Sequence, residues 1–295
     1  MIFMKNIWNS LNDYLINSRP YSWLDLILLG FVAKFIVLPV LEFSLKDIIM
    51  VATLLCLWGF FNLALEARHN YSYRGKIKWQ LPIIPLVVAI VISIFVNVYS
   101  IYFILFSTLF VLAYLLKNKN LYFGIFSSIF RGLIQAMYFL YAISLFGNVF
   151  SSTILFLAFT IFSLYFIRAI VGDIRDFKHN KKANKSTLPV IFGIKNTRVG
   201  VFIALLGISI SVLYFFNSIF LIVPIVLFSF SILFYKCGYT LHQLMINVTT
   251  FFSINIIFYI TSQDLVLVSL LFVAIYTNML FYPLLKRKSN PLFEQ

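Results

Sequence analysis

The stretch RAIVGDIRDFKHNKKANKSTLPVIFG, residues 168–193, places two aspartates three positions apart and follows them with a group of lysines. It comes directly after a long apolar run. The chain of 295 residues contains nine aspartates and glutamates in total, against 23 lysines and arginines. Two scarce carboxylates at the end of an apolar segment therefore need a chemical reason.

The composition around that stretch is typical of an integral membrane protein. Hydrophobic residues make up 62% of the chain, charged residues make up 11%, and the mean hydropathy is +0.99. An average soluble domain is about 45–50% apolar and about 25% charged, so no globular core could bury this much apolar side chain. We expect an all-α bundle of about nine to ten transmembrane helices, forming a single membrane-embedded domain over residues 1–295. Apolar runs that could cross a bilayer lie at residues 22–41, 47–66, 81–97, 99–116, 122–146, 150–171, 198–216, 218–236, 243–261 and 264–285.

The first residues and the loop charges predict how the chain lies in the bilayer. Apolar side chains including Ile2, Ile7 and Leu11 fall near one helical face, which predicts an amphipathic helix over about residues 1–18 on the membrane surface. The net charge of +14 comes largely from lysines and arginines in alternate loops. Because positively charged loops stay in the cytoplasm, a path with both chain ends inside satisfies this rule at every loop. We expect a multi-pass protein of the cell membrane.

A polar cluster ends the second apolar run, in the sequence FNLALEARHN at residues 61–70. Asn62, Glu66 and Asn70 are spaced i, i+4 and i+8, which predicts that they share one face of a helix. The second and sixth runs both pass from outside to inside in the predicted topology. This cluster therefore faces the cytoplasm together with the opening stretch.

The opening stretch contains the second cluster, at the end of the sixth run. Asp173, Asp176 and Asn180 are spaced i, i+3 and i+7, again on one predicted helical face. Carboxylate and amide oxygens are ligands that suit Mg²⁺, and the neighbouring lysines suit a phosphate group. The alternative is that both aspartates form salt bridges with those lysines in a solvated loop. His69 and His179 lie beside the clusters, but no further ligands at zinc spacing accompany them.

These residues resemble the second aspartate-rich motif of the UbiA-type intramembrane prenyltransferases, which runs R-E-I-x-x-D-I-x-D-x-x-x-D and continues to T-L-P-V-x-x-G. Arg19 and Pro20 are similar to the family's opening Arg-Pro, and Tyr114 and Lys117 resemble its Tyr-x-x-Lys element. The resemblance implies a UbiA-like helical bundle. The positions that match the second motif without a gap are Arg168, Ile170, Asp173, Ile174, Asp176, Thr187, Leu188, Pro189, Val190 and Gly193.

The chain departs from the family pattern mainly in the first motif, N-D-x-x-D-x-x-x-D. Asn62 matches its first position, but Leu63, Glu66 and Asn70 stand where the family has aspartates. In the second motif, Ala169 replaces a glutamate and Asn180 the last aspartate. The sequence also has ten apolar runs where the family has nine helices.

The resemblance implies transfer of a prenyl group from a polyprenyl diphosphate to an aromatic or lipid acceptor within the membrane, with Mg²⁺-assisted ionisation of the diphosphate. It implies catalytic roles for Asp173, Asp176 and Glu66. The implied Mg²⁺ ligands are Asn62, Glu66, Asn70, Asp173, Asp176 and Asn180. The expected diphosphate contacts are Lys181, Lys185, Arg68, Arg74, Lys117 and Arg131.

Other interpretations remain open at this point. The same fold could support a terpene cyclase, in which the prenyl cation is attacked by its own double bonds. The altered first motif also fits a catalytically inactive protein that binds an isoprenoid lipid. The basic residues could serve as cytoplasmic topology charges, and Arg131 could extend its side chain to the membrane interface. Lys34 lies within the first apolar run, and the sequence suggests no partner for it.

Overall fold

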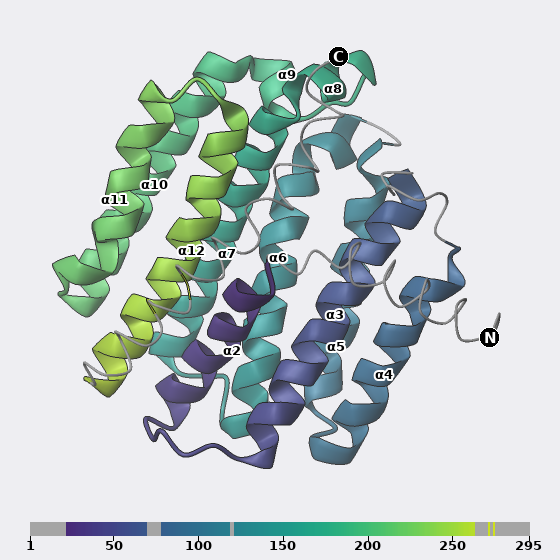
Figure 1. Ribbon diagram of the computed structural model, residues 1–295, viewed down its shortest axis with the longest axis vertical. Coiled ribbons are helices and arrows are strands. Elements are labelled where there is room, and N and C mark those ends of the chain that lie inside the picture. Colours follow the sequence, from purple (N-terminus) through teal and green to yellow (C-terminus); the bar gives the residue numbers. More distant parts are fainter. Residues whose placement is uncertain (1–21, 70–77, 119–120, 263–270, 272–273, 275–295) are drawn as a thin grey trace, which may run out of the picture.

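The computed structural model describes residues 22–69, 78–118, 121–262, 271 and 274, and these contain helices and no strands. The predicted amphipathic helix at residues 1–18 and, apart from residues 271 and 274, the tenth apolar run lie outside the described residues. Figure 1 shows the helices packed side by side, with α6 and α7 between α10 and α11 at one edge and α4 and α5 at the other. The helices are α2 (Trp23–Val37), α3 (Leu45–His69), α4 (Gln80–Val96), α5 (Ser100–Leu115), η2 (Leu116–Asn118), α6 (Leu121–Phe146), α7 (Ser152–Arg175), α8 (Phe177–Lys182), α9 (Leu188–Phe192), α10 (Ile194–Phe216), α11 (Ile219–Phe234) and α12 (Gly238–Thr261).

Each of the first nine predicted apolar runs coincides with a helix within the part of the chain that the structure describes. Five of these helices are long and apolar enough to cross a bilayer, namely α3, α6, α7, α10 and α12. Helices α4, α5 and α11 are apolar but shorter. The all-helical, multi-pass architecture is therefore confirmed, while the count of nine to ten spans and the extent of the single domain stay predictions.

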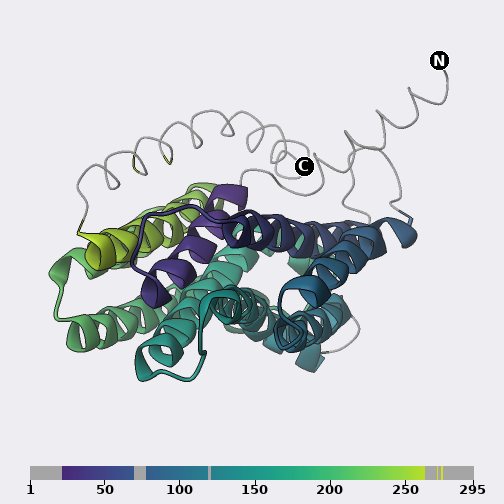
Figure 2. The same cartoon turned by 90° about the horizontal axis from the view of Figure 1, so that it is seen from below.

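Close backbone contact between α6 and α7 forms the centre of the bundle. A Cβ atom on Gly132 of α6 would lie 2.6 Å from the carbonyl oxygen of Phe162 on α7, so a side chain there would push the helices apart. Tyr138, Phe139 and Tyr141 of α6 are fully buried in the core. Figure 2 shows α2 and α12 running next to each other over this centre, in agreement with the packing between them.

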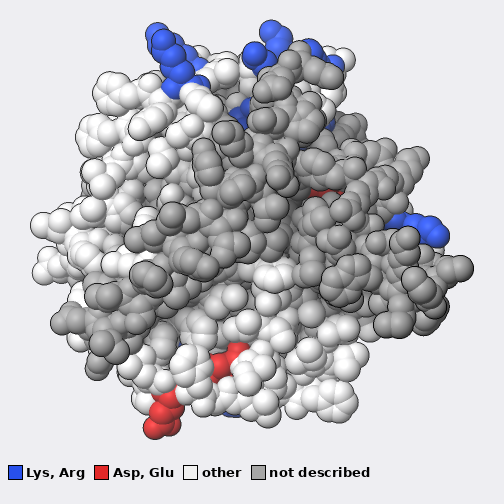
Figure 3. All heavy atoms as spheres, in the orientation of Figure 1, with Lys and Arg blue, Asp and Glu red and all other residues white. Residues whose placement is uncertain are grey.

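The outer surface of the bundle is apolar, as expected for contact with lipid. Phe95 on α4, and Ile210 and Tyr214 on α10, are exposed. In Figure 3 the lysine and arginine side chains gather mainly at the end of the bundle where α8 and α9 lie, while the described surface between the two ends is largely uncharged. This charge asymmetry agrees with the predicted topology.

Lys34 has a partner that the sequence did not suggest. Helix α2 ends at Val37, four residues before the predicted end of the run at 41, because Pro39 favours an extended Leu38. Lys34 therefore lies in the last turn, where its Nζ is 2.9 Å from Oδ1 of the buried Asp47 at the start of α3. The ion pair joins the ends of α2 and α3 on the side opposite α8.

Candidate functional site

The second polar cluster does not lie on one continuous helix. Helix α7 ends at Arg175, Asp176 takes a non-helical conformation, and Asn180 lies on the separate helix α8. The prediction of a continuous helix through Asp173, Asp176 and Asn180 is therefore wrong, because the helix is interrupted at Asp176. The chain stays hydrogen-bonded across the break, since the Asp176 amide donates to the Gly172 carbonyl at 3.0 Å and the Asn180 amide donates to the Asp176 carbonyl at 2.8 Å.

Asp173 forms a buried ion pair with a residue from a distant part of the chain. Its Oδ1 lies 2.7 Å from Nζ of Lys117, in the short helix η2, and the two side chains are 7% and 12% exposed. The Lys117 ammonium also lies 5.5 Å from the centre of the Tyr114 ring. Burial opposes the charge on Lys117 most strongly, but the Asp173 carboxylate, Tyr114 and Asp176 together outweigh burial and raise the pKa of the lysine. The Tyr-x-x-Lys element and the second motif therefore meet at one site.

Asp176 is held by its neighbour in the chain. The Arg175 guanidinium donates from Nε to Oδ1 of Asp176 at 2.8 Å and from Nη2 to Oδ2 at 2.7 Å. Its Nη1 lies 3.2 Å from Nδ1 of His242 on α12. Both aspartates therefore form ion pairs, as the alternative expected, and their partners include Lys117 for Asp173 and Arg175 for Asp176.

The lysines after the motif differ in their surroundings. Lys181 is exposed, whereas Lys185 is partly buried, and its amide donates to the Asn180 carbonyl at 2.9 Å. Burial lowers the pKa of Lys185, and the Lys117 charge lowers it further. Asn180 is buried, and its Nδ2 has no hydrogen-bond partner among the described residues. The start of α6 packs on this loop, because a Cβ on Gly124 would lie 2.6 Å from the Ser186 carbonyl oxygen.

The first polar cluster lies on the last turns of α3. Asn62 and Glu66 are fully buried, as their spacing predicts for one helical face. Asn62 donates from Nδ2 to the Trp58 carbonyl at 2.8 Å, and its Oδ1 has no hydrogen-bond partner in the described part of the chain. Arg68 is exposed, which agrees with the topology role and not with a contact inside the bundle. The remaining predicted site residues of this region, Asn70 and Arg74, lie outside the described residues.

Aromatic contacts connect this cluster to the second one. The Phe61 ring on α3 packs edge-on against Tyr114 of α5, with ring centroids 5.6 Å apart, and Tyr114 neighbours Lys117. On its other side, Phe61 contacts Arg131 of α6, whose Cζ lies 4.4 Å from the ring centroid. Arg131 also lies over the Trp58 ring at 4.6 Å. Its guanidinium is thus held between two rings inside the bundle and does not extend to the interface.

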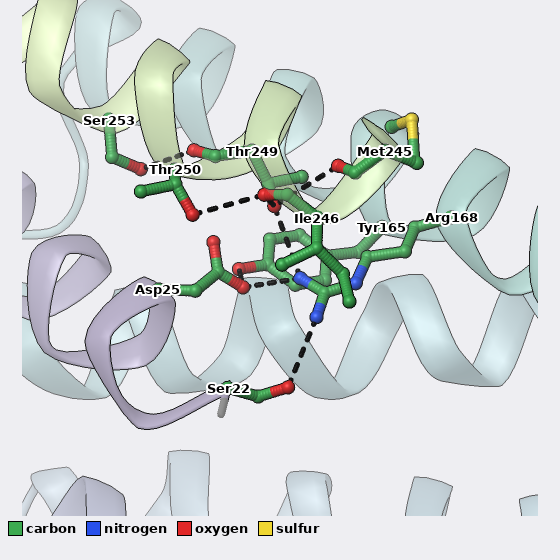
Figure 4. A network of polar contacts seen from close by, with 9 residues as sticks. All are labelled: Ser22, Asp25, Tyr165, Arg168, Met245, Ile246, Thr249, Thr250 and Ser253. Carbon is green, nitrogen blue, oxygen red and sulfur yellow. Dashed lines mark hydrogen bonds and ion pairs between the residues drawn. The ribbon is translucent and has the colours of Figure 1, made fainter. Parts of the chain in front are cut away.

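A buried network that sequence reasoning missed joins α2, α7 and α12 (Figure 4). The Arg168 guanidinium forms an ion pair with Asp25 of α2 and donates to Oγ1 of Thr249 on α12 at 3.1 Å. The Tyr165 hydroxyl donates to Asp25 at 2.6 Å, and the Ser22 hydroxyl accepts from Arg168 at 3.4 Å. The sequence feature that could have revealed this network is Asp25, an acidic residue inside an apolar run. Arg168 therefore anchors α7 one to two turns before Asp173.

The donor set is chemically suited to Mg²⁺. It offers carboxylates of Asp173, Asp176 and Glu66, and the buried, unmatched Oδ1 of Asn62. Hard oxygen donors of this kind fit Mg²⁺, which keeps several positions for water and phosphate oxygens. Among the described residues no group of three or more histidine, cysteine, aspartate or glutamate side chains gathers as a metal site. The ion pairs of Asp173 and Asp176 would have to open for both carboxylates to coordinate the ion.

Comparison with known proteins matches residues 74–257, well over half of the chain, to the UbiA prenyltransferase family. The chain belongs to this family. The matched region contains Asp173, Asp176 and Lys117, whereas Glu66 precedes its first residue. No curated protein sequence matches the chain significantly.

Solved structures share the fold of this UbiA family member at low sequence identity. A structure of digeranylgeranylglyceryl phosphate synthase has 18% identity and a TM-score of 0.65, covering 86% of this chain and 100% of that one. A UbiA homologue from Archaeoglobus fulgidus bound to GPP and Mg²⁺ has 17% identity and a TM-score of 0.58, covering 85% and 100%. A UbiA homologue from Archaeoglobus fulgidus bound to DMAPP and Mg²⁺ has 16% identity and a TM-score of 0.55, covering 93% of this chain and 99% of that one.

Proposed function

We propose that the protein transfers a prenyl group from a polyprenyl diphosphate to an aromatic or lipid acceptor within the membrane. The observation that carries the proposal is the Lys117–Asp173 ion pair, which places a cation and a carboxylate together at the end of an apolar bundle. Lys185 adds a second, partly buried cation nearby. Family membership and the A. fulgidus homologue bound to GPP and Mg²⁺ support the same reaction.

The residues of the site suggest how the diphosphate is held. Asp173 would hold a metal ion, Lys117 would then be able to donate to a diphosphate oxygen, and Lys185 would supply a further charge-assisted contact. Mg²⁺ held by Asp173, Asp176 and Glu66, with amide oxygens from Asn62 and Asn180, would supply Lewis-acid stabilisation of the departing diphosphate. Lys181 and Arg68 are exposed and are better explained as cytoplasmic topology charges.

The apolar bundle completes the reaction. The bond between the prenyl carbon and the diphosphate oxygen breaks, and its electron pair leaves with the diphosphate. Fixed donors stabilise this developing negative charge, and the dry surroundings protect the allylic cation from water. The acceptor carbon or oxygen then forms the new bond and releases a proton. The charged end at α8 and α9 supports an active site that faces the cytoplasm.

A labelled-donor assay with the full chain in lipid nanodiscs tests the proposal. Prenyl diphosphates from about C10 to C50 would be supplied with Mg²⁺ and with aromatic or glycerophosphate-type acceptors, and the products separated. We expect label in a prenylated acceptor, and loss of at least about 100-fold in rate for Asp173→Asn and Asp176→Asn. Label in a cyclic hydrocarbon would instead identify a terpene cyclase.

A second candidate is a binding protein without catalysis. Two observations favour it. Both aspartates are paired with cationic side chains, and the first motif has lost acidic residues, with Leu63 standing where the family has an aspartate. In that case the wild-type protein binds a prenyl diphosphate but consumes none, with or without Mg²⁺. Equal rates in wild type and Asp173→Asn would count against any role for this carboxylate in turnover.

A further inference from the structure

A group of buried polar atoms between α3 and α6 has no hydrogen-bond partner among the residues that the structure describes. It comprises Nε1 of Trp58, Nη1 of Arg131, and both Oε1 and Nε2 of Gln135. Trp58 is 3% exposed and Gln135 is 1% exposed. Buried polar groups in native proteins are almost always hydrogen-bonded, so a cluster of unmatched ones indicates that another molecule completes it.

The geometry of α6 brings these atoms to one place. Arg131, Gln135 and Tyr138 are spaced i, i+4 and i+7 and therefore share one face of the helix. Arg131 at one end of this face contacts the Trp58 ring, and the Tyr138 hydroxyl at the other end donates to the Leu57 carbonyl of α3 at 3.0 Å. Gln135 lies between these two contacts, so its amide also faces α3.

This polar cluster lies deeper in the bundle than the aspartates of the second motif. Arg131 is about 15 Å along α6 from its start at Leu121, at about 1.5 Å per residue. Asp173, in contrast, lies within the last turn of α7, beside Lys117. A diphosphate held at Asp173 leaves the deeper group available for a second reactant.

The chemistry of the group favours an anion. The guanidinium, the indole N–H and the amide NH₂ are three groups that donate hydrogen bonds, and the Gln135 oxygen is an acceptor. Within the described residues Arg131 forms no salt bridge, although its Nη1 is buried and buried charges are usually paired. The rings of Trp58 and Phe61 fix the plane of the guanidinium, which prepares it for a two-point contact with a carboxylate or phosphate.

We propose that Arg131, Gln135 and Trp58 bind an oxyanion, a carboxylate or a phosphate, on the acceptor substrate. The inference rests on the proposed prenyl transfer and assigns Arg131 to the acceptor instead of the donor diphosphate predicted from the sequence. Arg131 forms the charged contact, and Gln135 and Trp58 orient the same group.

Equilibrium dialysis of the full chain in nanodiscs tests this assignment. The labelled probes are a hydroxybenzoate and a prenylglyceryl phosphate, each compared with a neutral analogue, the methyl ester and the dephosphorylated alcohol. We expect the wild type to prefer one anionic probe over its neutral analogue. Arg131→Gln should lower the affinity for that probe by roughly 10- to 100-fold, and Gln135→Leu should lower it by roughly 3- to 10-fold. Neither variant should change the affinity for the neutral analogue. Which of the two anionic probes responds distinguishes a carboxylate from a phosphate.

Further measurements guard against indirect effects. Arg131→Lys keeps the charge but loses the two-point contact, and should bind with intermediate affinity. Arg198→Gln, which removes an arginine that donates to the Lys236 carbonyl at 3.1 Å, is the matched control and should bind as wild type. Each variant would be compared with the wild type by thermal unfolding. Its affinity for a non-hydrolysable prenyl thiodiphosphate would also be measured, and this affinity should change less than about twofold.

The possible outcomes separate the two proposals. If Arg131→Gln lowers the affinity for the thiodiphosphate and not for the acceptor probe, Arg131 contacts the prenyl donor and the inference is wrong. If the wild type shows no preference for either anionic probe, the polar group holds water and the inference is also wrong. Preference for an anionic probe without any consumption of prenyl diphosphate would support the oxyanion site while contradicting prenyl transfer.

Discussion

Helix α7 carries two buried ion pairs, and they differ in how firmly they are held. Arg168 pairs with Asp25, and its guanidinium also donates to the hydroxyls of Thr249 and Ser22. The carboxylate of Asp25 receives a further hydrogen bond from Tyr165. Several polar groups on three helices therefore fix this pair in place.

The second pair lies nearer the end of the same helix. Asp173 contacts Lys117 by an ion pair, with the Tyr114 ring as the lysine's further neighbour. Lys117 comes from a short helix and not from a long one packed along α7. The comparison indicates that the Arg168 pair holds α7 in position, while the Asp173 pair is fixed by fewer contacts. In the function that we propose, the Asp173 pair exchanges its partners.

The largest effect is expected when the firmly held pair of Arg168 and Asp25 is removed. Arg168→Leu leaves the Asp25 carboxylate buried without its counter-charge, so we expect the free energy of unfolding to fall by about 3–5 kcal/mol. Thermal unfolding in detergent, followed by circular dichroism, measures the change. The double variant Asp25→Leu/Arg168→Leu should recover much of the loss. A change below about 1 kcal/mol in the single variant would show that the network does not anchor α7.

A second test displaces the loop beside the exchangeable pair. In Gly124→Ala the new methyl group would meet the Ser186 carbonyl oxygen at 2.6 Å, so the loop that carries Lys185 must shift. We expect a loss of stability of about 1–3 kcal/mol and weaker binding of a prenyl thiodiphosphate. The matched control is Gly207→Ala on α10, where a Cβ meets no atom within 4 Å. Unchanged donor affinity in Gly124→Ala would argue that the loop does not contact the diphosphate.

A third test opens the exchangeable pair itself. Lys117→Met leaves the largely buried Asp173 carboxylate without its counter-charge, so stability should fall by about 1–3 kcal/mol. The freed carboxylate should bind Mg²⁺ several-fold more tightly in the absence of donor, whereas donor affinity should fall by roughly tenfold. Isothermal titration calorimetry measures both affinities. Weaker Mg²⁺ binding in this variant would contradict the exchange of partners.

The smallest expected effect concerns pH. Burial lowers the pKa of His179 on α8 from its usual 6.5, and the Lys185 charge lowers it further, although Asp176 acts in the opposite direction. The unfolded chain therefore takes up a proton at higher pH than the folded one. This contribution to stability is constant above about pH 6.5 and falls as the pH drops below it, by under about 0.5 kcal/mol after solvent screening. His179→Gln should reduce the difference in thermal midpoint between pH 7.5 and pH 5.5.

Particular residues show how far the sequence could predict the site. Asn62 and Glu66 are both buried on α3, which agrees with the shared helical face that their spacing predicted, whereas the direct contact between Lys117 and Asp173 was not predicted. The break after Arg175 was not predictable from spacing, since the i, i+3, i+7 pattern assumes a continuous helix. The depth of Arg131 between aromatic rings also required the packed structure.

The sequence by itself determined that the chain is a helical membrane protein and that residues 168–193 carry a UbiA motif. Both conclusions rest on local properties, hydropathy along the chain and the order of residues in one stretch. Only the tertiary structure decided the partners: Asp173 pairs with Lys117, 56 positions away, and Arg168 pairs with Asp25, 143 positions away. Such pairs depend on the rotation and depth of each helix relative to its neighbours, which the apolar pattern leaves open because most faces of these helices are hydrophobic.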